Sequence, residues 1–287
     1  MGFKTKTDSP YEYIEGLSLE YAPAASGWQQ ETDLAKLFKD GIYGRAEHCV
    51  LDALYKYPFL NFRTLSRYLD IVYGTHGTPN WYHHILLKMR GDNIIYALRY
   101  GDNVFYALQD YVRLFWVNKK RYSVSIPDIC VSAVLEYASL AQWHISMMEG
   151  EKLVKNTLYQ NMKIAGETLV VPSYMEIVKS DTRYRIFSFA FPKGVKEISP
   201  FIALLSHMWE LMARSRRKNM VTLTVLTVSS LKEMEVANGV FKSCKTAKGH
   251  RIYYVLDGNT SEFSGLECLY YYIEEEGEYQ LKTIDVR

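Results

Sequence analysis

The chain has 287 residues, of which 48% are hydrophobic and 23% charged, and its formal net charge is +2. This composition allows a large buried core and excludes a globally disordered chain, while the length suits one large domain or two ordinary ones. The small net charge excludes a general polycation, so any binding to nucleic acid must depend on a local basic patch.

The cysteines are scattered along the chain and include no CxxC pair: Cys49, Cys130, Cys244 and Cys268. This spacing argues against a zinc site or a disulfide framework and suits a reducing compartment. The N-terminal segment has no apolar core of the secretory kind, and no run of about 18 apolar residues predicts a membrane span. We therefore expect a cytoplasmic protein that does not act at a membrane.

Residues 1–43 mix proline, glycine, serine and charged residues, with one short helical pattern near Glu31–Lys39. We interpret this stretch as an N-terminal arm. Two apolar stripes at helical spacing follow from residue 44. Pro58 ends the first, whereas Asn61 is a suitable N-cap and Gly74 a suitable end for the second. This segment therefore predicts two short helices joined by a tight connection.

A third helix is indicated by Thr78, a suitable N-cap, followed by Pro79 in the first turn. We assign its buried stripe to Trp81, Ile85 and Met89.

The segment IIYALRYGDNVFYAL, residues 94–108, directly follows the third helix and predicts a β-hairpin. Gly101 and Asp102 suit a two-residue type II′ turn, which has glycine first. That turn would pair Tyr100 with Asn103, Leu98 with Phe105 and Tyr96 with Ala107. Three short helices and a hairpin follow one another in the order of a winged helix-turn-helix domain, which we expect over residues 44–122.

The third helix of such a domain presents its outward face to the DNA major groove. Here that face would carry Asn80, His83, His84, Leu87 and Arg90. Residues 61–122 contain nine Lys/Arg and four Asp, a balance of +5 that would attract phosphates. The candidate DNA-binding residues, including three from the polar segment after the hairpin, are Asn80, His83, His84, Arg90, Arg99, Lys119, Lys120 and Arg121. The alternative is a protein-docking surface centred on Tyr82 and Leu87.

Residues 123–160 predict a long connecting helix that begins near Pro127, with an apolar stripe for core packing or, as a second choice, a dimer contact. Over residues 161–287 the order ββαβαβ predicts an α/β domain with a mixed sheet. Asp181–Thr182 would form the hairpin between its first two strands. Ser199 and Pro200 would begin its first helix, and MVTLTVLTVSS would be a buried strand.

Basic residues at the end of that helix have two interpretations. Arg214, Arg216, Arg217 and Lys218 either complement the helix dipole or form a second phosphate-binding patch. His207 and Glu210 have the i, i+3 spacing of some metal sites, but no histidine-rich partner segment accompanies them. No glycine-rich phosphate loop or nucleophile elbow occurs, so no metal or other cofactor is expected.

An α/β domain of this strand order resembles the restriction-endonuclease-like (PD-(D/E)xK) fold. That chemistry needs an Asp on one strand and an acidic residue two positions before a Lys on the next, to hold a metal ion. The second strand, YRIFSFAFP, has no carboxylate, which indicates an inactive domain. A metal-dependent nuclease would require distant carboxylates to converge, for example Glu176 and Asp257.

The helix–turn–helix spacing of AEHCVLDALYKYPFLNFRTLSRYL, the hairpin IIYALRYGDNVFYAL, and the later order of YRIFSFAFP, ALLSHMWELM and MVTLTVLTVSS resemble the replication-relaxation family of plasmids and integrative elements. The likeness covers roughly residues 44–287 and is one of pattern and order. It implies a winged helix joined to a degenerate nuclease-like domain and a role on mobile-element DNA. The arginine-rich third helix of that family is missing at Asn80–Leu87.

We therefore expect an α+β protein with an N-terminal winged helix-turn-helix domain and a C-terminal α/β domain. The expected function is non-catalytic binding of double-stranded DNA in the replication, transfer or transcription control of a mobile element. A second copy of the chain and replication or transfer proteins are the further partners we consider. The alternatives are a protein-interaction scaffold that docks through both domains and a metal-dependent nuclease.

Overall fold

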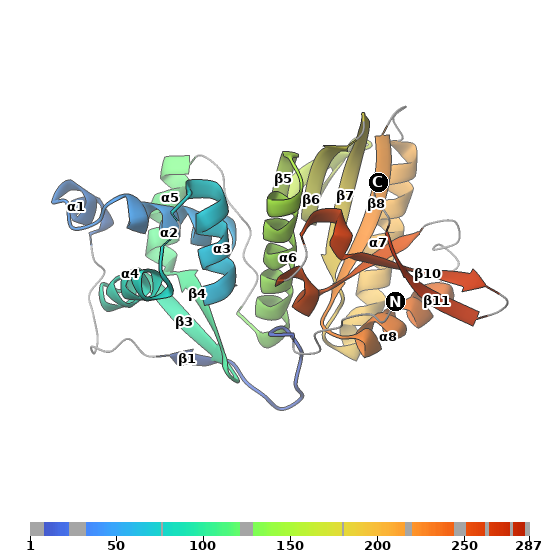
Figure 1. Cartoon of the computed structure of the whole chain (residues 1–287), viewed down its shortest axis with the longest axis horizontal. Coiled ribbons are helices and arrows are strands. Elements are labelled where there is room, and N and C mark those ends of the chain that lie inside the picture. Colours follow the sequence, from blue (N-terminus) through green and yellow to red (C-terminus); the bar gives the residue numbers. More distant parts are fainter. Residues whose placement is uncertain are drawn as a thin grey trace. The chain divides into compact units, whose positions relative to one another are not determined.

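The computed structural model describes residues 9–22, 33–75, 77–120, 129–179, 181–215, 220–243, 251–261, 264–275 and 278–284. The chain divides into two compact units, drawn in Figure 1. The N-terminal unit comprises Ile14–Ala138, and the C-terminal unit comprises Met1–Tyr13 and Ser139–Arg287. Helix α6 (Val131–Gly150) begins in the first unit and ends in the second. The protein is α+β, and each unit is described by itself.

The helices of the N-terminal unit that precede α6 are α1 (Leu34–Lys39), α2 (Arg45–Lys56), α3 (Phe62–Tyr73), α4 (Pro79–Gly91) and α5 (Asp110–Lys120). Its strands are β1 (Glu20–Ala22), β2 (Leu60–Asn61), β3 (Ile95–Tyr100) and β4 (Asn103–Leu108). They form an antiparallel sheet in the order β1-β3-β4-β2. The three helices and the hairpin expected between residues 44 and 108 are therefore present, in that order.

The hairpin forms in the predicted register, with Tyr100 opposite Asn103 and Leu98 opposite Phe105. Gly101 has a φ of 56°, which suits the first turn position of a type II′ turn. The predicted caps are also confirmed. The Asn61 side chain accepts a hydrogen bond from the Thr64 amide at 2.8 Å, and the Thr78 hydroxyl accepts one from the Trp81 amide at 3.3 Å.

The buried face of α4 includes Ile85 and Met89, as predicted, but Tyr82 and Leu86 are inward and Trp81 is not. Tyr82 is 4% exposed and Trp81 39%, so the inward side chains are Tyr82, Ile85, Leu86 and Met89. The Tyr82 hydroxyl bonds to the Asp70 carboxylate of α3, lies 2.6 Å from Thr75 Oγ1, and accepts from the Gly77 amide at 3.1 Å. This polar anchor holds Tyr82 inward and fixes the connection between α3 and α4.

Two further elements of this unit were not expected from the sequence. The stretch interpreted as an N-terminal arm contributes β1, which pairs with the outer edge of β3, and Tyr100 Oη accepts from the Ile14 amide at 2.6 Å. The segment read as a polar exit from the hairpin is helix α5, whose Val112 and Trp116 are fully buried. These two side chains are spaced four residues apart, as expected for one helix face.

The C-terminal unit contains a seven-stranded mixed sheet in the order β11-β10-β9-β8-β7-β6-β5. Its strands are β5 (Leu153–Ile164), β6 (Glu167–Lys179), β7 (Thr182–Ala190), β8 (Met220–Val228), β9 (Ile252–Leu256), β10 (Leu269–Glu275) and β11 (Glu278–Thr283). Among the described strands of this sheet, the β7–β8 and β8–β9 pairs are parallel and the others are antiparallel. The remaining elements are α7 (Val195–Arg214), α8 (Leu231–Ser243) and the 3-10 turns η2 (Asp257–Ser261) and η3 (Gly265–Cys268).

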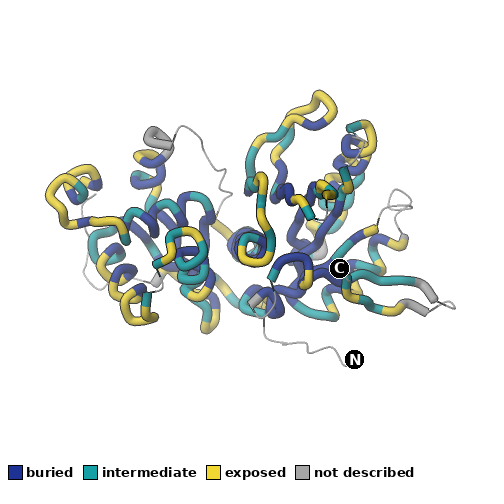
Figure 2. Tube along the Cα trace, turned by 45° about the horizontal axis from the view of Figure 1, so that its top comes forward, coloured by how far each residue is buried: buried dark blue, intermediate teal, exposed yellow. Residues whose placement is uncertain are grey.

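Helices cover both faces of this sheet. Side chains of α6, such as Trp143 and Met147, share a core cluster with Ile186 and Val225 of the sheet. Side chains of α7 and α8 form another cluster with the alternate sheet residues, among them Phe187, Leu226 and Tyr254. The last six residues of β7 and of β8 are buried, and the predicted buried strand MVTLTVLTVSS is β8. Figure 2 shows the buried residues of the chain in dark blue.

Several boundaries of the C-terminal unit differ from the expectation. The connecting helix predicted over residues 123–160 ends at Gly150, and strand β5 begins at Leu153. This strand was missed because LVKNTLYQNMKI is a half-exposed edge strand rich in polar residues. Helix α7 begins at Val195 after Gly194, so Ser199 does not cap it and Pro200 lies inside the helix. Strands β10 and β11 extend the sheet beyond the predicted order ββαβαβ. No helix of the described residues is long and apolar enough to span a membrane.

Candidate nucleic-acid interface

The outward face of α4 is the surface that the sequence singled out. Asn80, His83, His84 and Leu87 are all exposed on this helix, as predicted. Arg90, at the end of the same helix, is half-buried. The face therefore offers one amide and two imidazole side chains, groups that form hydrogen bonds with base edges or phosphates.

The start of α3 lies beside this face. The rings of Phe62 and His83 are 6.5 Å apart and roughly perpendicular. Arg63, the next residue of α3, is exposed. Sequence reasoning did not select Arg63 as a site residue, although its position in the first turn of the second of three helices was a usable signal. Phosphate contacts from that turn would position a duplex against α4.

Lys88 is exposed on α4 but is already engaged within the unit. Its Nζ lies 2.7 Å from Glu47 Oε1 and 2.5 Å from the Ile42 carbonyl oxygen, and 4.8 Å from the centre of the Tyr43 ring. Burial acts to raise the pKa of Glu47, but hydrogen bonds from Lys88 and the Gly44 amide hold that pKa below its usual value. Lys88 therefore stabilises the contact of α2 with α4.

The hairpin and the helix after it provide fewer described cations for DNA contact than the sequence predicted. Arg99 is exposed, but Glu20 of β1 lies directly opposite it in the sheet, and the exposed turn carries Asp102. Lys119 and Lys120 end helix α5, and their side chains lie outside the described residues, as does Arg121. Among the described residues, Arg63 is therefore the exposed cation best placed to contact a phosphate beside α4.

Of the residues predicted as a second basic patch, the structure describes Arg214, which lies in the last turn of α7. Its guanidinium lies 3.7 Å from Glu167 and 3.9 Å from Glu210, and His207 lies 3.1 Å from Glu167. These contacts pair Arg214 with both carboxylates and His207 with Glu167. Arg216, Arg217 and Lys218 lie outside the described residues.

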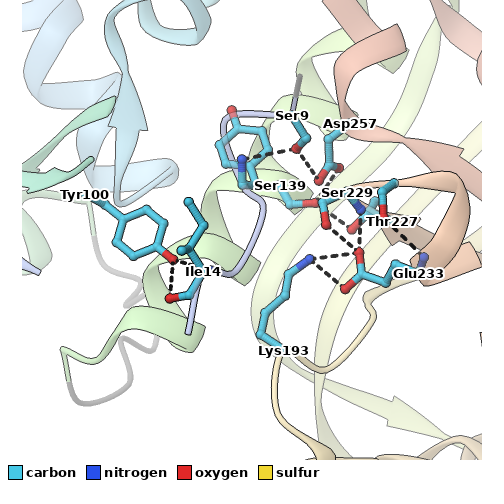
Figure 3. A network of polar contacts seen from close by, with 11 residues as sticks. Ser9, Ile14, Tyr100, Ser139, Lys193, Thr227, Ser229, Glu233 and Asp257 are labelled. Carbon is cyan, nitrogen blue, oxygen red and sulfur yellow. Dashed lines mark hydrogen bonds and ion pairs between the residues drawn. The ribbon is translucent and has the colours of Figure 1, made fainter. Parts of the chain in front are cut away.

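The C-terminal unit contains a buried polar cluster that no sequence motif predicted, shown in Figure 3. Because β7, β8 and β9 are parallel, their carboxyl ends share one edge of the sheet. The cluster is built at and near that edge by Ser139, Lys193, Thr227, Ser229, Glu233 and Asp257.

Two parts of the cluster can be distinguished by their hydrogen bonds. Ser139 Oγ lies 2.7 Å from both Thr227 Oγ1 and Asp257 Oδ1. Lys193 Nζ lies 3.1 Å and 3.2 Å from the two carboxylate oxygens of Glu233, which also accepts from the Ser229 hydroxyl at 2.7 Å. Complete burial raises the pKa of Asp257 to about 7, although the charge of Lys193 acts in the opposite direction.

This arrangement does not form a metal site. No group of three or more His, Cys, Asp or Glu side chains suited to a metal occurs among the described residues. Both oxygens of Glu233 are engaged by Lys193 and Ser229. Ser230 accepts from the Glu233 amide at 3.2 Å, so the Ser–x–x–Glu spacing also caps helix α8. The cluster is therefore a satisfied structural network.

The carboxylate pair required by the nuclease alternative is also separated. The sheet register shows how far apart the two residues lie along strand β8. Glu176 is level with Thr222 of β8, through Arg185 of β7. Asp257 directly follows Leu256, which is level with Val228 of β8. Six residues of strand β8 between these levels correspond to about 20 Å. Glu176 is occupied by Tyr174 and by Arg183, whose Nε lies 2.9 Å away. The proposed convergence of Glu176 with Asp257 is wrong.

Comparisons with known proteins give a limited likeness. No family model matches the chain, and no curated protein matches it. An XisH family protein from Nostoc punctiforme is similar to 42% of this chain over 94% of its own length, with 10% identity and a TM-score of 0.32. An fdxN element excision controlling factor protein from Anabaena variabilis is similar to 42% of the chain over 93% of its own length, with 10% identity and a TM-score of 0.31.

Proposed function

We propose that the N-terminal unit binds double-stranded DNA as a winged helix-turn-helix domain. The observation that carries the proposal is the exposed face of α4 with Asn80, His83 and His84, held beside the first turn of α3 by a fixed connection. Two further features support the assignment. The hairpin β3–β4 follows the helices α2, α3 and α4, and the short strand β2, which lies between α2 and α3 in the sequence, pairs with β4.

The proposed geometry assigns different tasks to the two helices. Asn80 and His83 on α4 would face the base edges, where an asparagine side chain suits adenine. Arg63 on α3 would contact a phosphate and set the orientation of the duplex. Arg99 would contribute less than expected, because Glu20 lies opposite it in the sheet.

The C-terminal unit would act without catalysis, as a dimerisation or partner-binding domain. Its mixed sheet with helices on both faces supports the resemblance to the restriction-endonuclease-like fold, and the separated carboxylates support an inactive form. The place of the protein in the replication, transfer or transcription control of a mobile element rests on the resemblance to the replication-relaxation family.

The proposal is tested by titrating the full chain into a fluorescent duplex of about 30 base pairs at about 50 mM and about 200 mM salt. Several phosphate contacts predict measurable affinity at the lower salt concentration and a marked decrease at the higher one. Absence of binding at the lower concentration, or an affinity that does not respond to salt, would overturn the proposal.

A second candidate function is protein docking through the same face of α4. Trp81 is 39% exposed and Leu87 46% exposed, and exposed aromatic and apolar side chains are enriched in protein interfaces. Tyr82, which we expected at the centre of such a surface, is buried. If this function holds, replacing Trp81 and Leu87 with serine would abolish partner binding, and the chain would show no salt-dependent affinity for the duplex.

A further inference from the structure

Arg113 in α5 has a buried guanidinium in the N-terminal unit. The residue is 8% exposed, and its Nε, Nη1 and Nη2 have no hydrogen-bond partner among the described residues. A guanidinium remains charged in proteins and has five N–H donors in a fixed planar fork. Removing such a group from water without an acceptor is strongly unfavourable. The folded chain therefore positions a strong donor group whose natural partner is an oxyanion.

The surroundings of this guanidinium are mainly aromatic. Its central carbon lies 5.6 Å from the centre of the Tyr55 ring of α2. Tyr55 and Tyr137 are 1% and 3% exposed, and Tyr96 of β3 is half-buried. Burial lowers the pKa of Arg113, while Tyr55, Tyr96 and the exposed Asp110 act in the opposite direction. A ring face attracts the cation but leaves its N–H groups unpaired.

We propose that Arg113 binds a small oxyanion, a phosphate or carboxylate group, in this tyrosine-lined position. The planar guanidinium matches the two oxygens of either group, and a charge-assisted pair is stronger than a neutral hydrogen bond. Among the groups that act on the charge of Arg113, Tyr96 is half-buried and Asp110 is exposed, from which we infer that an ion can reach the guanidinium from the surface. The ligand is therefore small, and the site is separate from the α4 face assigned to DNA.

The test is the melting temperature of the full chain in chloride, inorganic phosphate or acetate at equal ionic strength and pH. Binding to the folded state predicts a melting temperature that rises with the logarithm of phosphate or acetate concentration, relative to chloride. Arg113→Met should remove this rise. It should also raise the melting temperature in chloride alone, because an unpaired buried charge is replaced by an apolar side chain of similar length.

Lys39→Met is the matched control, since it removes one exposed positive charge from the same unit and should keep the response. A rise with phosphate alone identifies a phosphate ligand, and a rise with acetate alone identifies a carboxylate. A rise with both supports the shared oxyanion chemistry. If Arg113→Met does not fold, Arg113→Lys should fold with a weakened response, because the fork is lost.

The proposal is overturned if neither anion raises the melting temperature above that in chloride, or if the Arg113 variant responds as the wild type does. Duplex binding is measured separately, and its outcome does not depend on this site.

Discussion

The hydroxyl of Tyr82 on α4 donates a hydrogen bond to the carboxylate of Asp70 on α3. The same oxygen accepts from the Gly77 amide, so one side chain joins both helices and the segment between them. Burial and the contact with Asp70 raise the pKa of Tyr82, so the phenol remains protonated and remains a donor at neutral pH. The position of the outward face of α4 therefore depends on an inward-facing residue.

Tyr82→Phe should lower the free energy of unfolding of the N-terminal unit by about 1–2 kcal/mol, since the ring still packs but Asp70 loses a donor. Urea denaturation measures the change. Tyr21→Phe is the control, because Tyr21 is 64% exposed and should change stability little. Equal stability of the Tyr82 variant and the wild type would show that the hydrogen bond does not hold α3 and α4 together.

Lys88→Met should destabilise the same unit by about 1–2 kcal/mol, because the buried carboxylate of Glu47 would lose its charged partner. Lys88 itself is partly exposed, so the loss of unfolding free energy should be smaller than for a fully buried ion pair. Chemical denaturation of this variant is compared with that of Lys39→Met, which removes an exposed lysine. Similar stability of the two variants would contradict a structural role for Lys88.

The stability of the C-terminal unit should depend on the ionisation of Asp257. Its folded pKa of about 7 lies above the ordinary value of 3.8, so the folded chain retains a proton that the unfolded chain releases. This stabilisation is complete below about pH 4 and is lost as the pH rises through about 7, with a total change on the order of 4 kcal/mol.

Asp257→Asn should make the stability of the C-terminal unit nearly independent of pH in this range, since an amide keeps an oxygen acceptor near Ser139 but does not ionise. Melting temperatures measured from pH 4 to pH 8, with the exposed Asp181→Asn variant as the control, test the expectation. If the melting temperature of the Asp257 variant depends on pH as that of the wild type does, Asp257 is not the group responsible.

Local rules predicted the N-terminal unit well because its signals are short-range. Caps at Asn61 and Thr78, and a glycine-first turn at Gly101, act within a few residues and were confirmed. The outward positions of Asn80 and His83 followed from helical periodicity. Trp81 was placed inward in error, since the partner of Tyr82 is Asp70, twelve residues away in sequence.

The parts that were missed depend on long-range pairing. Strand β1 is recognisable only through its contact with β3, and β5 has the polar composition of an edge strand. The cluster around Asp257 joins α6 with the ends of three strands, which no spacing in the sequence shows. Arg113 could be counted as a cation, but its burial among tyrosines depends on the folded arrangement of four elements.

The most direct test of the account is the affinity of Arg63→Glu for a duplex at about 50 mM salt, because losing one phosphate contact and adding a negative charge should weaken binding about tenfold or more. Lys196→Glu is the matched control, since Lys196 is exposed on α7 in the other unit. We expect weakened binding for Arg63→Glu and wild-type affinity for Lys196→Glu. Wild-type affinity for Arg63→Glu, or an equal loss in both variants, would contradict a DNA interface at α3 and α4.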